Sequence, residues 1–226
     1  MVDGLVGSEM CIRDRFTKAL TKQNKQLKNI VDQIYNLLQE INFIPEIILG
    51  HSAGAVIAYE LAKKLENSPY TVAINAAFGQ FSGLAGVAFP YFAKIAAATT
   101  IPARLLTLLA NKQDLVQKLL SGTGSTIPRE QIRCYQYLFT SPDHVDGTLQ
   151  MMADWELGDF LDQLPRDTSP IHFFVGEKDK TVPSHISHSW ARVISNSRLT
   201  ECKGLGHLMH EEDPRTVSSI LKTSFN

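Results

Sequence analysis

The chain has 226 residues, of which 44% are hydrophobic and 20% charged, and its formal net charge is −1. This composition is ordinary for a globular protein with a buried core, and the near-zero charge argues against the basic surface of a nucleic-acid-binding protein. The three cysteines show neither a disulfide framework nor a metal-binding spacing, so we expect a reducing, cytoplasmic location.

The N-terminal segment differs in character from the rest of the chain. Leu5–Arg15, LVGSEMCIRDR, resembles the translation of a transposase sequencing adapter, and segments of that kind are set aside when a fold is inferred. We therefore expect residues 1–15 to be an artefactual leader and authentic sequence to begin near Phe16. Apolar residues then recur at helical spacing, which predicts one long amphipathic helix that ends before Asn42.

The segment 46–65, EIILGHSAGAVIAYELAKKL, predicts a strand, a tight turn and a helix in succession. Glu46–Leu49 is short, branched and apolar, as in a buried strand. From Ala55 onward, apolar residues recur at the spacing of one helix face. A strand followed at once by a helix is the context in which a catalytic nucleophile is presented.

The turn itself has the G-x-S-x-G spacing of a nucleophile elbow, with Gly50, His51 and Gly54 around Ser52. Such an elbow holds the serine in a strained conformation and pushes its hydroxyl outward. The backbone N–H of Ala53 would then face a developing oxyanion. In the alternative interpretation, Ser52 only caps the helix.

Three further apolar runs predict strands: Tyr70–Asn75, Ile171–Gly176 and, more weakly, Arg198–Lys203. Helical stretches separate the predicted strands, which is typical of a parallel sheet in an α/β domain. We assign residues 16–78 and 168–226 to this core.

Residues 79–167 lie between the second and third predicted strands and have mostly helical patterning, which predicts a helical cap. Its first part, residues 79–110, carries only Lys94 and Arg104 as charges and is long enough to compete as a membrane span. Glycines and Pro90 interrupt the run, however. A cap with an apolar underside, touching a membrane at its periphery, is therefore favoured over a span.

An acid and a base follow the last two predicted strands in the order that an elbow requires. Asp179 lies in the loop after one strand, and His207 lies between glycine and apolar residues after the next. The sequence therefore predicts a catalytic triad of Ser52, Asp179 and His207. We expect Ser52 Oγ within hydrogen-bonding range of one His207 ring nitrogen, with Asp179 on the other.

Other assignments of these chemical roles remain open. His210 is the nearest rival base, although its position is typical of a helix start. His185 and His188 could form a metal-binding pair, but no third ligand cluster supports a metal site. Asn75, at the end of a predicted strand, cannot act as an acid.

GHSAGA, the Asp179 loop and GLGHLMHEE together resemble the α/β-hydrolase family. The stretches INAAFGQFSGLAG, LLSGTGS, SPDHVDGTLQMMADWEL and GLGHLMHEEDP are more specifically similar to the magnesium-chelatase accessory proteins of bacteriochlorophyll biosynthesis. This resemblance implies an α/β-hydrolase core and a role near insertion of magnesium into protoporphyrin IX, with association with magnesium chelatase.

The sequence departs from this family before the nucleophile. The family carries several strands there and a loop that supplies the second oxyanion N–H. About thirty-five plausible residues precede Ser52, too few for those strands and the helix. We therefore expect a partial fold without its first strands, an inactive chain, and aggregation through an exposed strand edge.

The chemistry predicted for the complete protein is that of a serine hydrolase. Ser52 attacks an acyl carbonyl, His207 transfers the proton, Asp179 orients the imidazole, and no cofactor is required. The alternatives are a non-catalytic tetrapyrrole-binding or chelatase accessory module and a generic esterase. An apolar cap favours a hydrophobic substrate, such as a tetrapyrrole. The residues expected to line its pocket are Phe78, Phe81, Phe89, Met151, Met152 and Trp155.

Overall fold

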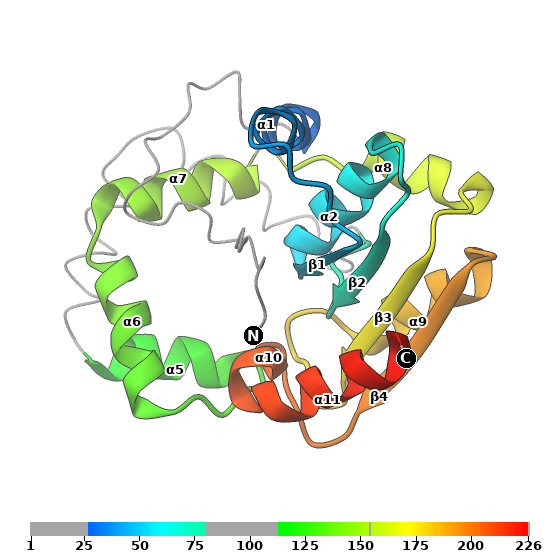
Figure 1. Cartoon of the computed structure of the whole chain (residues 1–226). Coiled ribbons are helices and arrows are strands. Elements are labelled where there is room, and N and C mark those ends of the chain that lie inside the picture. Colours follow the sequence, from blue (N-terminus) through cyan, green and yellow to red (C-terminus); the bar gives the residue numbers. More distant parts are fainter. Residues whose placement is uncertain (1–26, 80–112, 154, 226) are drawn as a thin grey trace.

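The computed structural model describes residues 27–79, 113–153 and 155–225. Its centre is a parallel sheet whose strands lie in chain order, β1-β2-β3-β4 (Figure 1). The strands are β1 Ile47–His51, β2 Tyr70–Ile74, β3 Ile171–Gly176 and β4 Ser197–Cys202. The α/β class and the parallel sheet predicted from sequence are confirmed, and the strand bounds agree within one or two residues.

Burial explains why the sequence patterns predicted these strands well. All six residues of β3 are buried, and so are four of the five in β2. Parallel strands covered on both faces read as continuous apolar runs rather than alternating ones. The register aligns Gly50 with Ala73 and Ile74 with Phe174, which brings the carboxyl ends of β1, β2 and β3 to the same edge.

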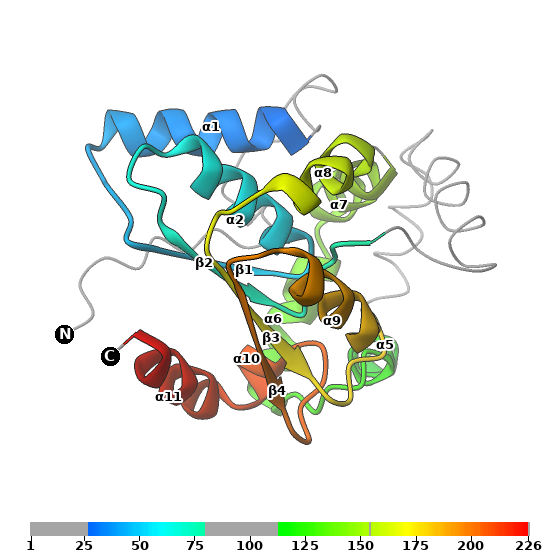
Figure 2. The same cartoon turned by 90° about the vertical axis from the view of Figure 1, so that its right-hand side faces the viewer.

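Helices cover both faces of this sheet (Figure 2). On one face lie α2 (Ala53–Lys64), α8 (Gly158–Gln163) and α9 (Ser184–Val193), with α1 (Leu27–Glu40) packed against α2. Their shared core includes the edge-to-face rings of Tyr59, Phe78, Phe160 and Phe173. On the other face lie α10 (Met209–Glu212) and α11 (Pro214–Phe225).

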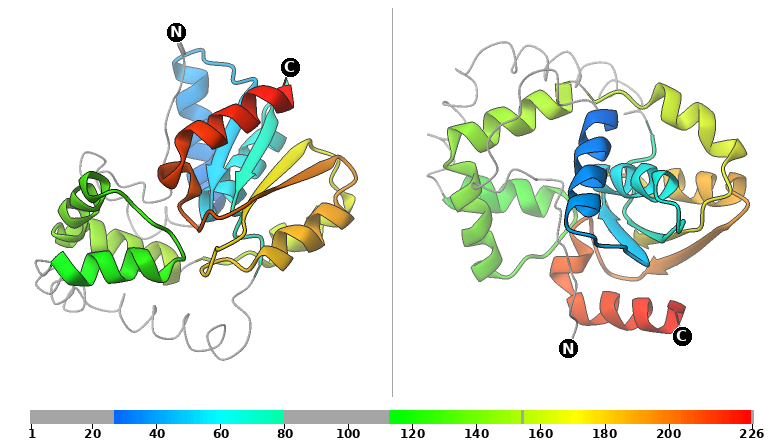
Figure 3. Two further views of the ribbon diagram at one scale, coloured as in Figure 1. Left: turned by 90° about the horizontal axis from the view of Figure 1, so that it is seen from below. Right: turned by 45° about the horizontal axis from the view of Figure 1, so that its top comes forward.

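The predicted helical insert contributes α5 (Gln113–Gly122), α6 (Arg129–Phe139) and α7 (Pro142–Ala153). These three helices lie to one side of the sheet, and we call them the cap helices (Figure 3). The insert then continues into α8 and a short 3₁₀ turn, Leu164–Arg166, which pack on the core. None of the helices in the described ranges combines the length and apolar character that crossing a bilayer requires.

The strand that carries the elbow lies at one edge of the sheet. Ile47 and Leu49 of β1 are each 42% exposed, and Ile44 just before the strand is 73% exposed. Ile48, on the opposite face, packs between α1 and α2. This strand, which has the apolar sequence of a buried strand, is thus covered on only one face in the described structure. The expected leader, residues 1–15, and the start of the first helix lie outside the described residues.

Candidate active site

Ser52 occupies a strained turn between β1 and α2. Its φ of 54° and ψ of −120° lie in a region that non-glycine residues rarely adopt. Its N–H donates to the Ile74 carbonyl at 2.9 Å, which ties the turn to the neighbouring strand. A Cβ on Gly50 would meet the Gly54 carbonyl oxygen at 2.3 Å, so this turn closes only around a glycine.

The same geometry decides between the two interpretations of Ser52. The serine stands at the N-cap position of α2, yet its side chain makes no capping hydrogen bond. Ala53 is the first residue of the helix, so its N–H lies at the positive end of the helix dipole. The turn therefore has the geometry of an elbow rather than that of an ordinary serine cap.

Asp179 and His207 are paired in two adjacent loops. The acid loop, residues 177–183, follows β3, and the base loop, residues 203–208, follows β4. Asp179 Oδ2 lies 2.8 Å from His207 Nδ1, and the two side chains are 0% and 6% exposed. Asp179 Oδ1 accepts hydrogen bonds from the Thr181 and Val182 N–H groups at 2.7 and 2.9 Å. A carboxylate only accepts, so Nδ1 carries the proton and Nε2 is left to receive one.

The elbow and the base loop contact each other through His51. Its Nε2 donates to the His207 carbonyl at 2.9 Å, and the two rings lie 4.6 Å apart between centroids. Within the described part of the chain no hydrogen bond joins Ser52 Oγ to the His207 ring. The expected acid–base contact is therefore present, and the expected nucleophile–base contact is not formed in this state.

His210, the rival base, completes a cluster of three imidazoles. Its ring lies 4.5 Å from that of His51. Burial and the neighbouring His207 lower the pKa of His210 to about 4, partly offset by Glu212. Burial and both other histidines also lower the pKa of His51 well below its ordinary value. A base with a pKa near 4 accepts a proton poorly at neutral pH, so His210 is the weaker candidate.

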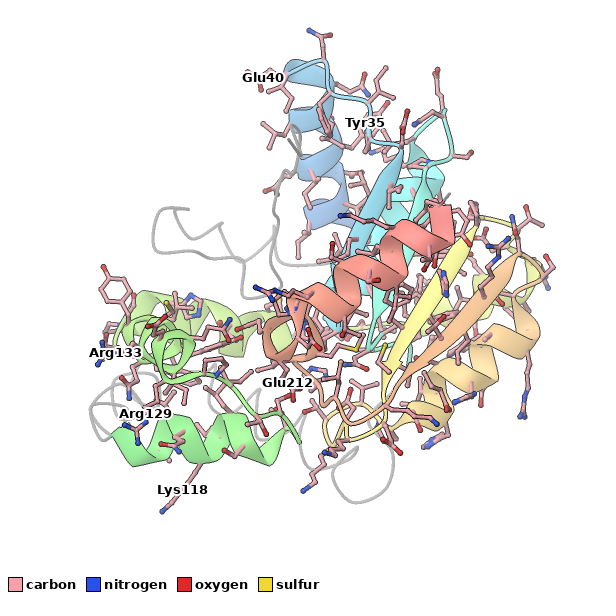
Figure 4. The ribbon with its side chains drawn as sticks, turned by 60° about the horizontal axis from the view of Figure 1, so that its bottom comes forward. Tyr35, Glu40, Lys118, Arg129, Arg133 and Glu212 are labelled. Atoms are coloured by element: carbon pink, nitrogen blue, oxygen red, sulfur yellow. The ribbon has the colours of Figure 1, made fainter. Side chains whose placement is uncertain are left out.

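The cap is attached directly to the base loop. Glu212 accepts from the Gly206 N–H at 2.7 Å through one oxygen and from the Thr126 N–H at 3.0 Å through the other. Ser125 Oγ accepts from the Leu208 N–H at 2.8 Å. Figure 4 shows Glu212 at the boundary between the cap helices and α10. We call residues 123–128, which connect α5 and α6, the cap loop.

The cap loop and the base loop also touch backbone to backbone. A Cβ on Gly206 would lie 2.4 Å from the carbonyl carbon of Gly124, so a side chain at this position would force the two backbones apart. The Lys180 N–H of the acid loop donates to the Thr123 carbonyl at 3.1 Å. Three chain segments far apart in sequence therefore meet at the catalytic candidates. The contact between these loops was not predicted from the sequence, although the segments LLSGTGS and GLGHLMHEE contain the residues that make it, Gly124, Gly206 and Glu212.

A cavity of about 490 Å³ lies between the cap loop and the acid loop, with Leu120, Ser125, Ile132 and Asp179 among its walls. The described pocket candidates Phe78, Met151 and Trp155 do not line it. Phe78 is fully buried among core rings, so its assignment to a pocket wall is corrected to core packing. Trp155 packs partly buried against the core. Phe81, Phe89 and the Met152 side chain lie outside the described residues.

The two histidines considered as a metal-binding pair, His185 and His188, do not lie in a cluster of metal ligands within the described ranges. His188 Nε2 lies 2.8 Å from Glu201 Oε1, and His185 is exposed on the first turn of α9. In the residues that the structure describes, no three histidine, cysteine or carboxylate side chains gather as a metal site.

Comparison with known proteins identifies the family of the chain. Residues 24–220 match the alpha/beta hydrolase family. The chain belongs to this family. It is 40% identical over 195 residues to the "Magnesium-chelatase 30 kDa subunit" of Rhodobacter capsulatus, covering 86% of this chain and 68% of the relative. It is also 22% identical over 200 residues to the "Uncharacterized hydrolase YugF" of Bacillus subtilis, at 84% and 69% coverage.

Solved structures of distant sequence share the fold. A bromoperoxidase from Bacillus anthracis superposes with a TM-score of 0.69 at 16% identity, covering 94% of this chain and 79% of that one. An esterase from Exiguobacterium antarcticum superposes with a TM-score of 0.65 at 16% identity, covering 90% and 75%. Identities this low establish the fold alone.

Proposed function

We propose that this α/β hydrolase is a serine hydrolase in which Ser52, His207 and Asp179 form the catalytic triad. The observation that carries the proposal is the buried Asp179–His207 pair beside a strained elbow that leaves the Ser52 side chain without a capping bond. The strained backbone of Ser52 costs free energy, and strain of this kind is concentrated at functional sites.

The proposed reaction is acyl transfer to Ser52 and then to water. His207 Nε2 takes the hydroxyl proton as Ser52 Oγ attacks the acyl carbonyl, and it returns that proton to the leaving group. Asp179 keeps the proton of Nδ1 in place and stabilises the imidazolium. The Ala53 N–H, at the start of α2, donates to the oxyanion. Water then repeats the sequence on the acyl-enzyme, so the serine is regenerated.

The similarity to a magnesium-chelatase subunit supports a place for this chemistry near magnesium insertion into a tetrapyrrole. We assign residues 79–167 to a cap over the site and propose a hydrophobic, tetrapyrrole-related substrate. The second candidate function is a chelatase-associated module that binds a tetrapyrrole without turnover, which the same similarity favours.

A fluorophosphonate probe tests the nucleophile. In the complete protein, we expect the wild type to become covalently labelled and Ser52→Ala to remain at background, because the probe reacts with an activated serine. Ser187→Ala is the matched control, since it removes another buried serine hydroxyl, on α9. Equal labelling of wild type and Ser52→Ala would place the nucleophile elsewhere.

Tryptophan fluorescence distinguishes the two candidate functions by ligand. If the cap binds a tetrapyrrole, protoporphyrin IX should quench the fluorescence saturably, and Trp155→Phe should reduce that quenching more than Trp190→Phe. Trp190 donates its indole N–H to the Phe78 carbonyl in the core, so we expect it to lie farther from the ligand. Tetrapyrrole binding without probe labelling supports the accessory module, and ester turnover without tetrapyrrole binding supports a generic esterase.

A further inference from the structure

Asn75 follows β2 and lies where the loops of the three triad candidates converge. The residue is 2% exposed and has a φ of 45°, in the left-handed region that asparagine tolerates better than most residues. An asparagine cannot serve as the acid of a triad. None of the triad chemistry described above uses its amide.

The Asn75 amide makes three hydrogen bonds to the backbone. Nδ2 donates to the carbonyls of Gly206 at 3.0 Å and His207 at 2.8 Å. Oδ1 accepts from the Gly176 N–H at 2.7 Å. Gly176 ends β3 immediately before the acid loop, whereas Gly206 and His207 belong to the base loop. One buried side chain therefore joins both loops.

The elbow is fixed to the same point. Ser52 donates to the carbonyl of Ile74, the residue before Asn75, at 2.9 Å. Its own carbonyl accepts from the Ala77 N–H, two residues after Asn75, at 3.1 Å. The His207 carbonyl that Asn75 holds also accepts from His51 of the elbow at 2.9 Å. The position of His207 relative to Ser52 thus depends on contacts that meet at Asn75.

We propose that Asn75 is a positioning residue for the triad. By holding the Gly206 and His207 carbonyls, it fixes the position of the His207 ring relative to Asp179 and Ser52. This inference rests on the proposed serine-hydrolase function for its effect on rate. Asn75 acts through His207, and its amide meets backbone groups rather than the reacting atoms.

The chemistry of the site explains why an asparagine is needed. Two carbonyls require two donors, and the Gly176 N–H requires an acceptor, which only a carboxamide of this length supplies together. An aspartate would keep the acceptor but direct a carboxylate at two carbonyl oxygens. Alanine would remove the hydrogen-bond partner of the Gly206 carbonyl and of the Gly176 N–H, and would leave the His207 carbonyl with His51 alone. Each unpaired buried group carries a desolvation cost.

The test compares Asn75→Asp and Asn75→Ala with a matched control, Asn67→Asp. Asn67 Nδ2 also donates to a carbonyl, that of Pro45 at 2.7 Å, but at the opposite end of the strands. Circular dichroism and thermal unfolding show which variants are folded. On those, ¹H NMR records the low-field resonance of the His207 Nδ1 proton shared with Asp179, and a fluorophosphonate records the labelling rate of Ser52.

We expect Asn75→Asp to shift or broaden the low-field resonance and to slow labelling on the order of 10²-fold, the cost of misplacing a reacting group by about 1 Å. Asn67→Asp should change neither. A folded Asn75 variant with the wild-type resonance and labelling rate overturns the inference. If alanine prevents folding, the near-isosteric aspartate variant decides.

The NMR readout separates this inference from the proposed function, because it reports the acid–base pair without turnover. Suppose that wild-type Ser52 is not labelled. The serine-hydrolase proposal then fails, whereas a resonance that responds to Asn75→Asp and not to Asn67→Asp still supports Asn75 as the residue that positions His207. An unresponsive resonance rejects the positioning role in that case too.

Discussion

Ser52 and His207 follow the two edge strands of the described sheet, β1 and β4, whereas Asp179 follows the inner strand β3. Ser52 follows β1, an edge strand with Ile47 and Leu49 each 42% exposed. Asp179 follows β3, all of whose residues are buried. His207 follows β4, and its loop is bonded to the core through Asn75 and to the cap through Glu212. The Asp179–His207 pair is thus fixed by hydrogen bonds to the core and to the cap, whereas Ser52 follows a strand with one exposed face.

The two halves of the candidate site therefore depend on different parts of the fold. The hydrogen bonds of the acid and base loops are made among residues that the structure describes, so we expect the Asp179–His207 pair to persist whenever β3 and β4 are folded. The exposed apolar edge of β1 is a site where strands of other molecules can pair. We therefore expect aggregation, where it occurs, to begin at the nucleophile side.

The largest effect should come from the acid–base half. Asp179→Asn keeps an acceptor for the Thr181 and Val182 N–H groups but presents an amide N–H₂ to His207, which then holds its proton on the wrong nitrogen. We expect the rate of fluorophosphonate labelling to fall by about 10⁴-fold. Asp162→Asn, on the exposed side of α8, should label at the wild-type rate. A similar rate in both variants would remove Asp179 from the triad.

Substitution of one isoleucine in each of β1 and β2 compares how strongly the two strands are buried. Ile74→Ala, at a fully buried position of β2, should cost about 2–5 kcal/mol of unfolding free energy because it leaves a cavity. Ile47→Ala, at the half-exposed edge, should cost about 1 kcal/mol because less surface is removed from water there. Urea denaturation followed by circular dichroism gives both values. Equal losses would mean that β1 is covered as well as β2 is.

The contact between cap loop and base loop should respond to one added methyl group. Gly206→Ala places a Cβ 2.4 Å from the Gly124 backbone, so the two loops must separate, at a cost of about 1–3 kcal/mol. Gly122→Ala meets nothing within 4 Å at the end of α5 and should be neutral or stabilise by up to about 1 kcal/mol. Thermal unfolding distinguishes them. A neutral Gly206→Ala would show that the loops are not in close contact in solution.

The smallest effect concerns acid stability near the elbow. The pKa of His210 is lowered from 6.5 to about 4 in the folded protein, so the unfolded chain binds the proton first as pH falls. Stability should therefore decrease between about pH 6.5 and pH 4, and His210→Gln should lessen that decrease. Partial exposure of the His210 side chain screens the effect, and His51 retains part of the slope. Identical pH profiles of unfolding would contradict the lowered pKa.

The sequence predicted the features that short segments determine. Strands β2 and β3 were found because buried parallel strands are uninterrupted apolar runs, whereas β1 and β4 are only partly buried and Arg198–Lys203 gave a weaker signal. Ser52, Asp179 and His207 were found because each follows one of the predicted strands. Their order along the chain, serine, aspartate and then histidine, is the order that this fold requires of a triad. The roles of these three residues stay predictions until labelling is measured.

What the sequence could not predict depends on contacts between distant segments. Asn75 meets His207 across 132 positions, and Glu212 meets Thr126 across 86. Nothing in the residues around Asn75 indicates those partners, because a loop asparagine has the same local pattern whether it is solvated or buried. Phe78 failed for the same reason: its apolar character fits a pocket wall and a core ring equally, and only packing decided for the core.

The attachment of Glu212 to both Gly206 and Thr126 has a consequence for recombining hydrolase parts. A chimera that receives a foreign insert between β2 and β3 would lose the backbone donor of Thr126 and the glycine contact at Gly124, leaving one Glu212 oxygen without its donor. A transplanted insert would therefore have to bring an equivalent of residues 123–128, or the engineered catalyst would lose one of the supports of its own imidazole. Specificity could be exchanged in the helices on either side of that loop, but the loop itself belongs with the proposed triad.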